Sequence, residues 1–216
     1  MQAGGIVLCG GDSRRMRRPK PLLPFGPECM LQRVVRLLRC AVRPLVVVAA
    51  DGQKLPNLPN VVRVVHDRRQ GYGPLEGLAV GLAAIREDVE AAFVTGCDVP
   101  FLVPDLVREL VRRVEGYDVV VPVEGDRHHP LAAVYRTAVL PEVEKLLAAG
   151  RLRPVFLYDS VRTKRVPVAD LRTVDPDLRT LANLNHPVDY LSALAEAGFD
   201  LPEDLRIALE ETTSRP

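Results

Sequence analysis

The sequence predicts an α/β protein with a doubly wound, mostly parallel sheet that carries helices on both faces. Two observations support this class. Short apolar runs alternate with helical patterns from the amino end to about residue 123, as in repeated strand–helix–strand units. The apolar runs also lack strict apolar–polar alternation, as expected for strands that are buried on both faces. A length of 216 residues suits a single domain of this kind.

Each element has its own signal. Apolar runs rich in β-branched residues predict strands, and apolar residues at three- and four-residue spacing, or a proline near the start, predict helices. The regular alternation ends after residue 123, and a later strand is expected near a sheet edge. The predicted strands are residues 5–9, 45–50, 61–66, 91–95, 118–123, 131–135 and 162–168, and the predicted helices are residues 30–42, 75–85, 104–114, 138–148, 187–197 and 202–211.

Composition and charge exclude several classes of function. The formal net charge is +1, so the chain as a whole is not expected to bind nucleic acid. No apolar stretch reaches the roughly 20 residues of a membrane helix, and no secretory signal is evident. The four cysteines form no Cys-x-x-Cys pair, which predicts neither a zinc site nor a disulfide framework, and Cys9 and Cys97 suit small buried positions at strand ends. We expect a cytoplasmic protein without a membrane partner.

Four predicted strands end at chemically informative residues. They lead to Gly10-Gly11, Ala50-Asp51, His66-Asp67 and Cys97-Asp98. Ligands of open α/β sheets bind beyond the carboxyl ends of the strands. The sequence therefore predicts that a glycine loop and three acidic residues meet at one edge of the sheet.

The glycine loop, LCGGDSRRMRRPK at residues 8–20, predicts a triphosphate site. Adjacent glycines let backbone N–H groups approach phosphate oxygens, and the arginines and Lys20 add positive charge. Pyrophosphate gains negative charge as it leaves, so both features suit nucleotidyl transfer. The loop is neither a Walker A motif nor the Gly-x-Gly-x-x-Gly of a dinucleotide-binding oxidoreductase.

Two carboxylates are candidates for metal or sugar binding. Asp98 can hold Mg²⁺, which binds through one or two carboxylates plus substrate phosphates. The alternative is that Asp98 stabilises the turn before Pro100. Asp67 either binds ribose or assists the metal, or it only ends its strand.

Three further motifs leave two interpretations open. The helix start at residues 73–77 either contacts substrate or is ordinary helix-start chemistry. The loop with His128 and His129 either lies near the acceptor substrate or is a plain surface loop. Asn185 suits a cap of the helix at residues 187–197 and also a polar ligand that reaches the site, and the two roles are compatible.

Four blocks, in order, carry a resemblance to a known family: LCGGDSRRMRRPKPLL, GPLEGLAVGL, CDVPFL and NLNHPVDY. The chain resembles the molybdenum cofactor guanylyltransferase family, within the glycine-loop nucleotidyltransferases, from about residue 4 to residue 191. The resemblance implies a Rossmann-like nucleotidyltransferase fold. It also implies transfer of GMP from GTP to molybdenum-molybdopterin, which yields molybdopterin guanine dinucleotide and pyrophosphate with Mg²⁺ as cofactor. Transient contact with molybdoenzymes or cofactor-biosynthesis proteins is expected.

The resemblance also implies a role for individual residues. The catalytic group comprises Arg15, Lys20 and Asp98, of which Asp98 is the metal ligand. The acceptor side comprises Asn183 and Asn185, and we add His129 to it from the histidine loop described above. The nucleotide side comprises Leu8, Cys9, Gly10, Gly11, Lys20, Asp67 and Asp98. These roles divide the single domain into a nucleotide-binding part (about residues 1–123), an acceptor-binding part (about 124–197) and a tail (about 198–216).

The chain departs from the family pattern at several positions. Cys9 replaces a usual alanine, and His186 a common threonine. Arg17-Arg18-Pro19 precedes Lys20 where the family commonly has Gly-x-Asp, and Pro19–Leu23 resembles the loop of sugar-phosphate nucleotidyltransferases. A polar residue expected after the second strand has no match at Ala49-Ala50. A cytidylyl- or sugar-phosphate nucleotidyltransferase, or a non-catalytic cofactor carrier of the same fold, stays open as an alternative.

Overall fold

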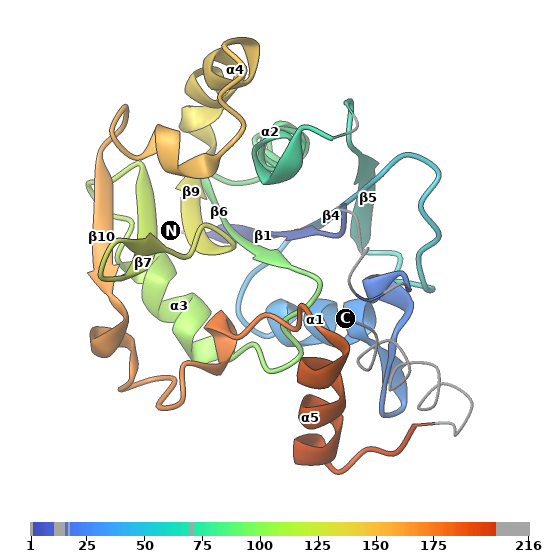
Figure 1. Ribbon diagram of the computed structural model, residues 1–216. Helices are drawn as coiled ribbons and strands as arrows, with labels where there is room; N and C mark the ends of the chain where they lie inside the picture. Colours follow the sequence, from blue (N-terminus) through green and yellow to red (C-terminus); the bar gives the residue numbers. More distant parts are fainter. Residues whose placement is uncertain (1, 11–15, 17, 70, 202–216) are drawn as a thin grey trace.

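The computed structural model describes residues 2–10, 16, 18–69 and 71–201, and within them it confirms the predicted α/β class. The main sheet has the strand order β10-β7-β9-β6-β1-β4-β5, and β8 pairs with β7 at one end (Figure 1). Its strands are β1 (Ala3–Leu8), β4 (Leu45–Ala49), β5 (Val62–His66), β6 (Ala91–Gly96), β7 (Val119–Glu124), β8 (Arg127–His128), β9 (Ala132–Arg136) and β10 (Thr163–Pro167).

The central strands run parallel because helical crossovers connect them. β1 pairs in parallel with β4 on one side and β6 on the other, and β5 continues the parallel set at the edge. β9 is antiparallel to both β6 and β7, and β10 is parallel to β7 at the other edge. The carboxyl ends of β1, β4, β5 and β6 therefore lie at the same side of the sheet, as predicted.

Helices cover both faces of this sheet (Figure 1). Ile6 and Val7 are adjacent in β1, both are fully buried, and they belong to two different cores. Val7 shares its core with α1 and α3, and Ile6 shares the other with α2 and α4. The helices are α1 (Met30–Arg39), α2 (Gly73–Ile85), α3 (Pro104–Arg112), α4 (Leu140–Ala148) and α5 (Pro187–Ala197).

The expectation that every strand is buried on both faces is wrong for β5. Most of its side chains are exposed, and Val64 keeps 40% of its surface accessible. β5 is an edge strand, so it lacks the cover that the central strands receive. Its β-branched sequence therefore records strand propensity rather than burial.

Two small features had no sequence signal. The strands β2 (Pro24–Phe25) and β3 (Glu28–Cys29) form a hairpin after the glycine loop, and β8 is equally short. The hairpin packs with α5 in a third, smaller core. Strands of two residues are too short to show an alternating pattern. The helix predicted at residues 202–211 lies outside the described residues.

Helix α2 approaches the sheet so closely that one position accepts only glycine. A Cβ atom at Gly81 would lie 2.5 Å from Cγ2 of Ile6. We expect Gly81→Val to lower the free energy of unfolding by about 1–3 kcal/mol, because the larger side chain overpacks the core. Ala83→Val, at an exposed position of the same helix, is the control and should change this free energy by less than about 1 kcal/mol. Equal effects in urea unfolding would contradict the packing argument.

Membrane insertion has no support in the described helices. None of them is long and apolar enough to cross a bilayer.

Candidate active site

A cleft of about 810 Å³ lies at the carboxyl edge of the sheet, where the sequence placed the site. The ends of β1, β4 and β6 contribute to its wall, together with the start of α2. The predicted residues that line it are Leu8, Cys9, Gly10, Lys20, Asp67 and Asp98. Gly11 and Arg15 lie outside the described residues.

Lys20 and Asp98 form the polar centre of this cleft. The Lys20 Nζ atom donates to Oδ2 of Asp98 at 2.7 Å, and the two side chains are only 16% and 12% exposed. Lys20 belongs to a short 3₁₀ helix, η1 (Lys20–Leu22), whereas Asp98 follows β6. The structure thus joins a cation and a carboxylate that are 78 residues apart in the sequence.

The two asparagines complete the same network. Lys20 Nζ also donates to Oδ1 of Asn185 at 3.0 Å, and Nδ2 of Asn183 donates to Oδ1 of Asp98 at 3.3 Å. The backbone N–H of Leu184, between them, donates to the Asp98 carbonyl oxygen at 2.9 Å. One backbone and two side-chain contacts therefore tie the segment before α5 to Lys20 and Asp98.

Asn185 does not cap α5, so that interpretation is wrong. The cap is provided by Asp189, whose Oδ2 accepts from the backbone N–H groups of Asn185 and His186 at 3.2 and 2.9 Å. The side chain of Asn185 is consequently free to contact Lys20. The second interpretation, in which Asn185 reaches the site, matches this contact.

Gly10 and Asp67 approach each other on the other side of the cleft. A Cβ atom at residue 10 would lie 2.4 Å from Oδ2 of Asp67, so glycine lets this carboxylate keep its present position. Oδ1 of Asp67 is buried and has no hydrogen-bond partner among the described residues. Burial, and secondarily the nearby Glu76 carboxylate, raises the pKa of Asp67 above its ordinary value. A buried acceptor without a donor suits a hydrogen-bonding ligand.

The raised pKa of Asp67 predicts a pH effect on stability. Between the ordinary value of 3.8 and the folded-state pKa, the native protein binds more protons than the unfolded chain. The free energy of unfolding should therefore fall as pH rises through that window, and the loss should persist at neutral pH. Asp67→Asn should reduce this fall, as measured by urea unfolding of the ligand-free protein at a series of pH values. An identical pH profile in the variant would show that Asp67 is not the group responsible.

Two arginines on the cleft wall were not singled out from the sequence. Arg68 Nε and Arg69 Nη2 donate to the two oxygens of the buried Glu76 carboxylate at 3.1 and 2.9 Å. Arg69 also stacks on Tyr72, with its Cζ atom 4.5 Å from the ring centroid. A charged run after a strand is usually a solvated turn, so the sequence Asp67-Arg68-Arg69 did not by itself indicate that Arg68 and Arg69 line the cleft.

Gln53 is a second residue that sequence reasoning did not find. Its Oε1 accepts from the backbone N–H of Ala50 at 2.9 Å, and its Nε2 donates to the Cys9 carbonyl oxygen at 3.1 Å. It therefore bridges the ends of β4 and β1. Gln53 is not among the residues that line the cleft, so it supports the site through these two backbone contacts.

The cysteines are structural, as expected for Cys9 and Cys97. Both are buried free thiols at the ends of β1 and β6. A hydrogen bond with Cys97, and then burial, raises the pKa of Cys9 well above its ordinary value. The Cys9 thiol is therefore protonated at neutral pH and is a poor nucleophile.

His129 is not among the residues that line the cleft. Burial lowers the pKa of His129, and its Nε2 atom is buried without a hydrogen-bond partner among the described residues. Leu131, two residues later, is the part of this loop that reaches the cleft wall. The acceptor role of His129 stays a prediction.

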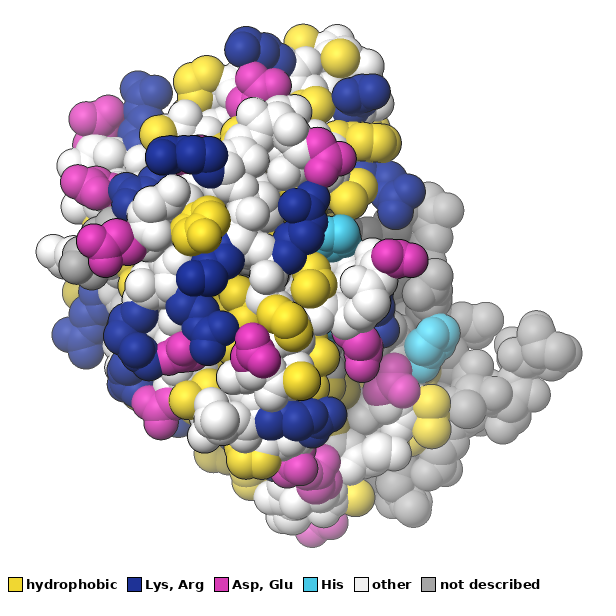
Figure 2. Space-filling model, turned by 90° about the vertical axis from the view of Figure 1, so that its left-hand side faces the viewer, with side chains coloured by type: hydrophobic (Ala, Val, Ile, Leu, Met, Phe, Trp, Pro, Cys, Tyr) yellow, Lys and Arg dark blue, Asp and Glu magenta, His cyan; other side chains and the backbone are white. Residues whose placement is uncertain are grey.

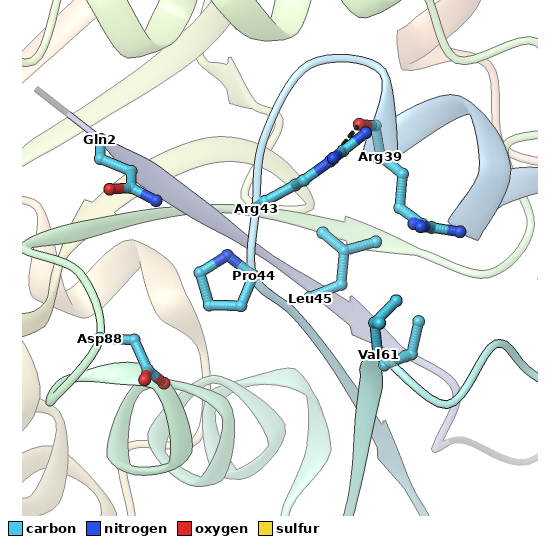
Figure 3. Close-up of a pocket in the computed structure, with 8 residues that line it drawn as sticks. Gln2, Arg39, Arg43, Pro44, Leu45, Val61 and Asp88 are labelled. Atoms are coloured by element: carbon cyan, nitrogen blue, oxygen red, sulfur yellow. Dashed lines mark hydrogen bonds between the residues drawn. The ribbon is translucent and has the colours of Figure 1, made fainter.

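A smaller hollow of about 470 Å³ lies at the opposite ends of the strands, by the amino ends of β1, β4 and β5 (Figure 3). Gln2, Arg39, Arg43 and Asp88 are its polar lining residues. The Nε atom of Arg43 donates to the Arg39 carbonyl oxygen at 3.4 Å. None of the predicted site residues that the structure describes lines it, and ligands of this fold class bind beyond the carboxyl ends of the strands.

The face over β10 carries basic and acidic side chains in mixture rather than a continuous basic stripe (Figure 2). Several of them pair, as Arg162 does with Asp118 at 2.9 Å and Arg165 with Asp159 at 2.8 Å. Nucleic-acid-binding surfaces concentrate unpaired basic residues. The absence of a nucleic-acid partner stays a prediction.

Comparison with known proteins assigns the family. The model of the MobA-like NTP transferase domain matches residues 5–164. A protein of Mycobacterium tuberculosis (strain ATCC 25618 / H37Rv), described as a probable molybdenum cofactor guanylyltransferase, is 41% identical over 191 residues, which are 85% of this chain and 92% of that protein.

Solved structures show the same fold. The crystal structure of molybdopterin-guanine dinucleotide biosynthesis protein A from Archaeoglobus fulgidus has a TM-score of 0.75 at 22% identity, and the match covers 92% of this chain and 99% of that one. A more distant protein of M. tuberculosis H37Rv, in complex with manganese, has a TM-score of 0.56 at 18% identity, with 77% and 88% of the two chains covered. Because the family model spans most of the sequence and the identity to the mycobacterial relative is 41%, the chain belongs to the MobA-like NTP transferases, as a nucleotidyltransferase of the molybdenum cofactor guanylyltransferase family.

Proposed function

We propose that the protein transfers GMP from GTP to molybdenum-molybdopterin and releases pyrophosphate. The observation that carries the proposal is the network of Lys20, Asp98, Asn183 and Asn185 at the carboxyl edge of the sheet. It joins the end of the glycine loop, which suits phosphates, to the segment before α5, which lies in the predicted acceptor part. The relatives of this chain support the identity of the two substrates.

Each side of the cleft has a separate task in this proposal. Gly10 leaves space beside Asp67, whose free carboxylate oxygen accepts hydrogen bonds from the nucleoside. Lys20 supplies positive charge to the triphosphate. Asn183 and Asn185 hold the acceptor side through their amides, which can both donate and accept. The roles of Gly11 and Arg15 in the glycine loop are part of the same proposal.

The residues present fit a magnesium ion. Asp98 and Asp67 both line the cleft, and one oxygen of Asp67 is buried without a donor among the described residues. Mg²⁺ ordinarily binds one or two carboxylates together with substrate phosphates, so Asp98 would hold it and Asp67 would assist. When bound, the ion would neutralise charge on the phosphates and favour attack at the α-phosphorus.

The chemical step is a displacement at phosphorus. An oxygen of the acceptor phosphate forms a bond to the α-phosphorus of GTP, and the bond to the bridging oxygen of the β-phosphate breaks, so that pyrophosphate leaves. The acceptor phosphate is already ionised at neutral pH, so the protein needs no strong general base. Its residues orient the two phosphates and stabilise the charge that moves to pyrophosphate.

A direct assay tests the proposal. Purified protein is incubated with Mg²⁺, molybdenum-molybdopterin and each of GTP, ATP, CTP and UTP, and both pyrophosphate and the dinucleotide product are measured. Product formed only with GTP is the expected result. Product formed with CTP alone would make the protein a cytidylyltransferase. Transfer to sugar phosphates but not to the pterin would make it a sugar-phosphate nucleotidyltransferase. No product with any nucleotide would favour a non-catalytic cofactor carrier.

A further inference from the structure

The catalytic network has to hold together two distant parts of the chain. Lys20 and Asn185 are 165 residues apart, and their contact at 3.0 Å joins the 3₁₀ turn η1 to the segment before α5. A hydrogen bond between two flexible side chains cannot by itself fix such segments, because ordering each side chain costs entropy. Something else must place the turn and the segment.

A third hydrophobic core, separate from the two that cover the sheet, lies directly behind both segments. Leu23 and Phe25 enter it from the turn and hairpin after Lys20, and Leu184 enters it from between the two asparagines. Because Leu184 is only 7% exposed, its burial fixes the backbone that presents Asn183 and Asn185. Helix α5 contributes Tyr190, Ala193 and Leu194 to this core, and Met16 and Met30 complete its buried members.

Tyr190 makes the polar link within this core. Its side chain is fully buried, and its hydroxyl group donates to the carbonyl oxygen of Pro24, the first residue of β2. Burial also raises the pKa of Tyr190, which keeps the hydroxyl group protonated as a donor. The bond thus ties α5 to the chain four residues after Lys20.

The hairpin is held from its other end by Phe199. The Phe199 ring lies so close to Gly26 that a Cβ atom there would be 2.6 Å from Cζ of the ring. Gly26 has a φ of +69°, which other residues rarely adopt. The ring of Phe25 packs edge-on against Phe199, with centroids 5.6 Å apart. The turn after Lys20 is therefore clamped by residues of α5 and of the segment that follows it.

We propose that Tyr190 is a positioning residue for nucleotidyl transfer: through the Pro24 carbonyl oxygen it holds Lys20 in reach of Asp98 and Asn185. Tyr190 itself does not line the cleft. The expected loss of activity rests on the proposed function, whereas the placement of Lys20 by Tyr190 rests on geometry alone.

The kinetic test is a double-mutant cycle. Tyr190→Phe removes the hydroxyl group alone, and we expect kcat/KM for GTP to fall about tenfold, because Lys20 is no longer held where it contacts the triphosphate. Tyr190→Phe should have almost no further effect on kcat/KM in a Lys20→Met background, because the residue it positions is gone. An equal effect in both backgrounds would overturn the proposal, as would an unchanged kcat/KM in the single variant.

Tyr158→Phe is the matched control. Tyr158 is 2% exposed, and its hydroxyl group makes one 3.0 Å hydrogen bond, to Tyr135, in a different core. It should lower the thermal midpoint by a similar amount and leave kcat/KM for GTP unchanged. A fall in kcat/KM equal to that of Tyr190→Phe would mean that any lost buried hydroxyl group impairs the enzyme, which would also overturn the proposal.

A spectroscopic measurement separates failure of this inference from failure of the proposed function. The ¹⁵N-labelled Lys20 ammonium signal, assigned by its loss in Lys20→Met, should be observable in the wild type and lost to solvent exchange in Tyr190→Phe. This result is expected even if no nucleotide is transferred. An unchanged signal in the variant would refute the positioning role, whatever the activity.

Discussion

Asp98→Asn is expected to reduce the rate of GMP transfer about 1,000-fold, the order of effect seen when one preorganised electrostatic group is removed. The change preserves the shape of the side chain but deletes the charge that pairs with Lys20 at 2.7 Å and, in the proposed function, the principal carboxylate for Mg²⁺. Pyrophosphate release under single-turnover conditions is the appropriate measurement, because it reports the chemical step rather than product dissociation.

The fold should survive this substitution. The hydrogen bond from Leu184 to residue 98 uses the backbone carbonyl oxygen, which asparagine retains. The control is Asp118→Asn, which also removes an ion-paired carboxylate. Asp118 pairs with Arg162 at 2.9 Å, and it does not line the cleft. It should transfer GMP at the wild-type rate. A fully active Asp98→Asn protein would remove Asp98 from the metal and catalytic roles.

Lys20→Met is expected to weaken binding of Mg²⁺·GTP about 10- to 100-fold, because a hydrogen bond to a charged group contributes about 1.5–3 kcal/mol. The methionine side chain keeps much of the apolar stem of lysine while it removes the ammonium group. Isothermal titration calorimetry with GTP and Mg²⁺, in the absence of the pterin, measures this loss without turnover.

Lys164→Met is the matched control for the loss of one positive charge. Lys164 lies in β10 with its Nζ atom 5.1 Å from the Tyr117 ring, and it does not line the cleft. Its substitution should leave GTP affinity unchanged. If both variants bind GTP as the wild type does, the basic run after the glycine pair is only a solvated surface.

The parallel part of the fold was predictable because its strands carry a strong physical signal. Leu45–Ala49 and Ala91–Gly96 are apolar, β-branched or small runs that are buried on both faces, and their ends follow from the polar residues after them. The direction of β9 was not predictable, since an apolar five-residue strand has the same pattern in either orientation. The β2–β3 hairpin was not predictable because each strand has only two residues.

Some residues of the candidate site were likewise predictable from the sequence, and others were not. Asp98 was predictable because it directly follows a buried strand, and Lys20 because it belongs to the basic run after the glycine pair; the structure brings the two together. Asn183 and Asn185 were found only through the resemblance, because nothing local shows that a segment before α5 returns to the cleft. Gln53, Arg68 and Arg69 act through contacts between separate elements, and such contacts leave no trace in local sequence patterns.

The position of the antiparallel strand β9 limits which segments can be exchanged between members of this family. It belongs to the second part of the chain, yet it lies between β6 and β7 of the first part, with Val134 paired to both Phe93 and Val120. A cut near residue 123 would remove β9 from between β6 and β7 and leave these two strands unpaired with each other. The two proposed parts are therefore not modules that fold separately. A chimaera that borrows the acceptor half of a relative would insert a foreign strand into the middle of the host sheet. New acceptor specificities in this fold should therefore arise from changes in loops at the cleft edge, rather than from exchange of whole segments.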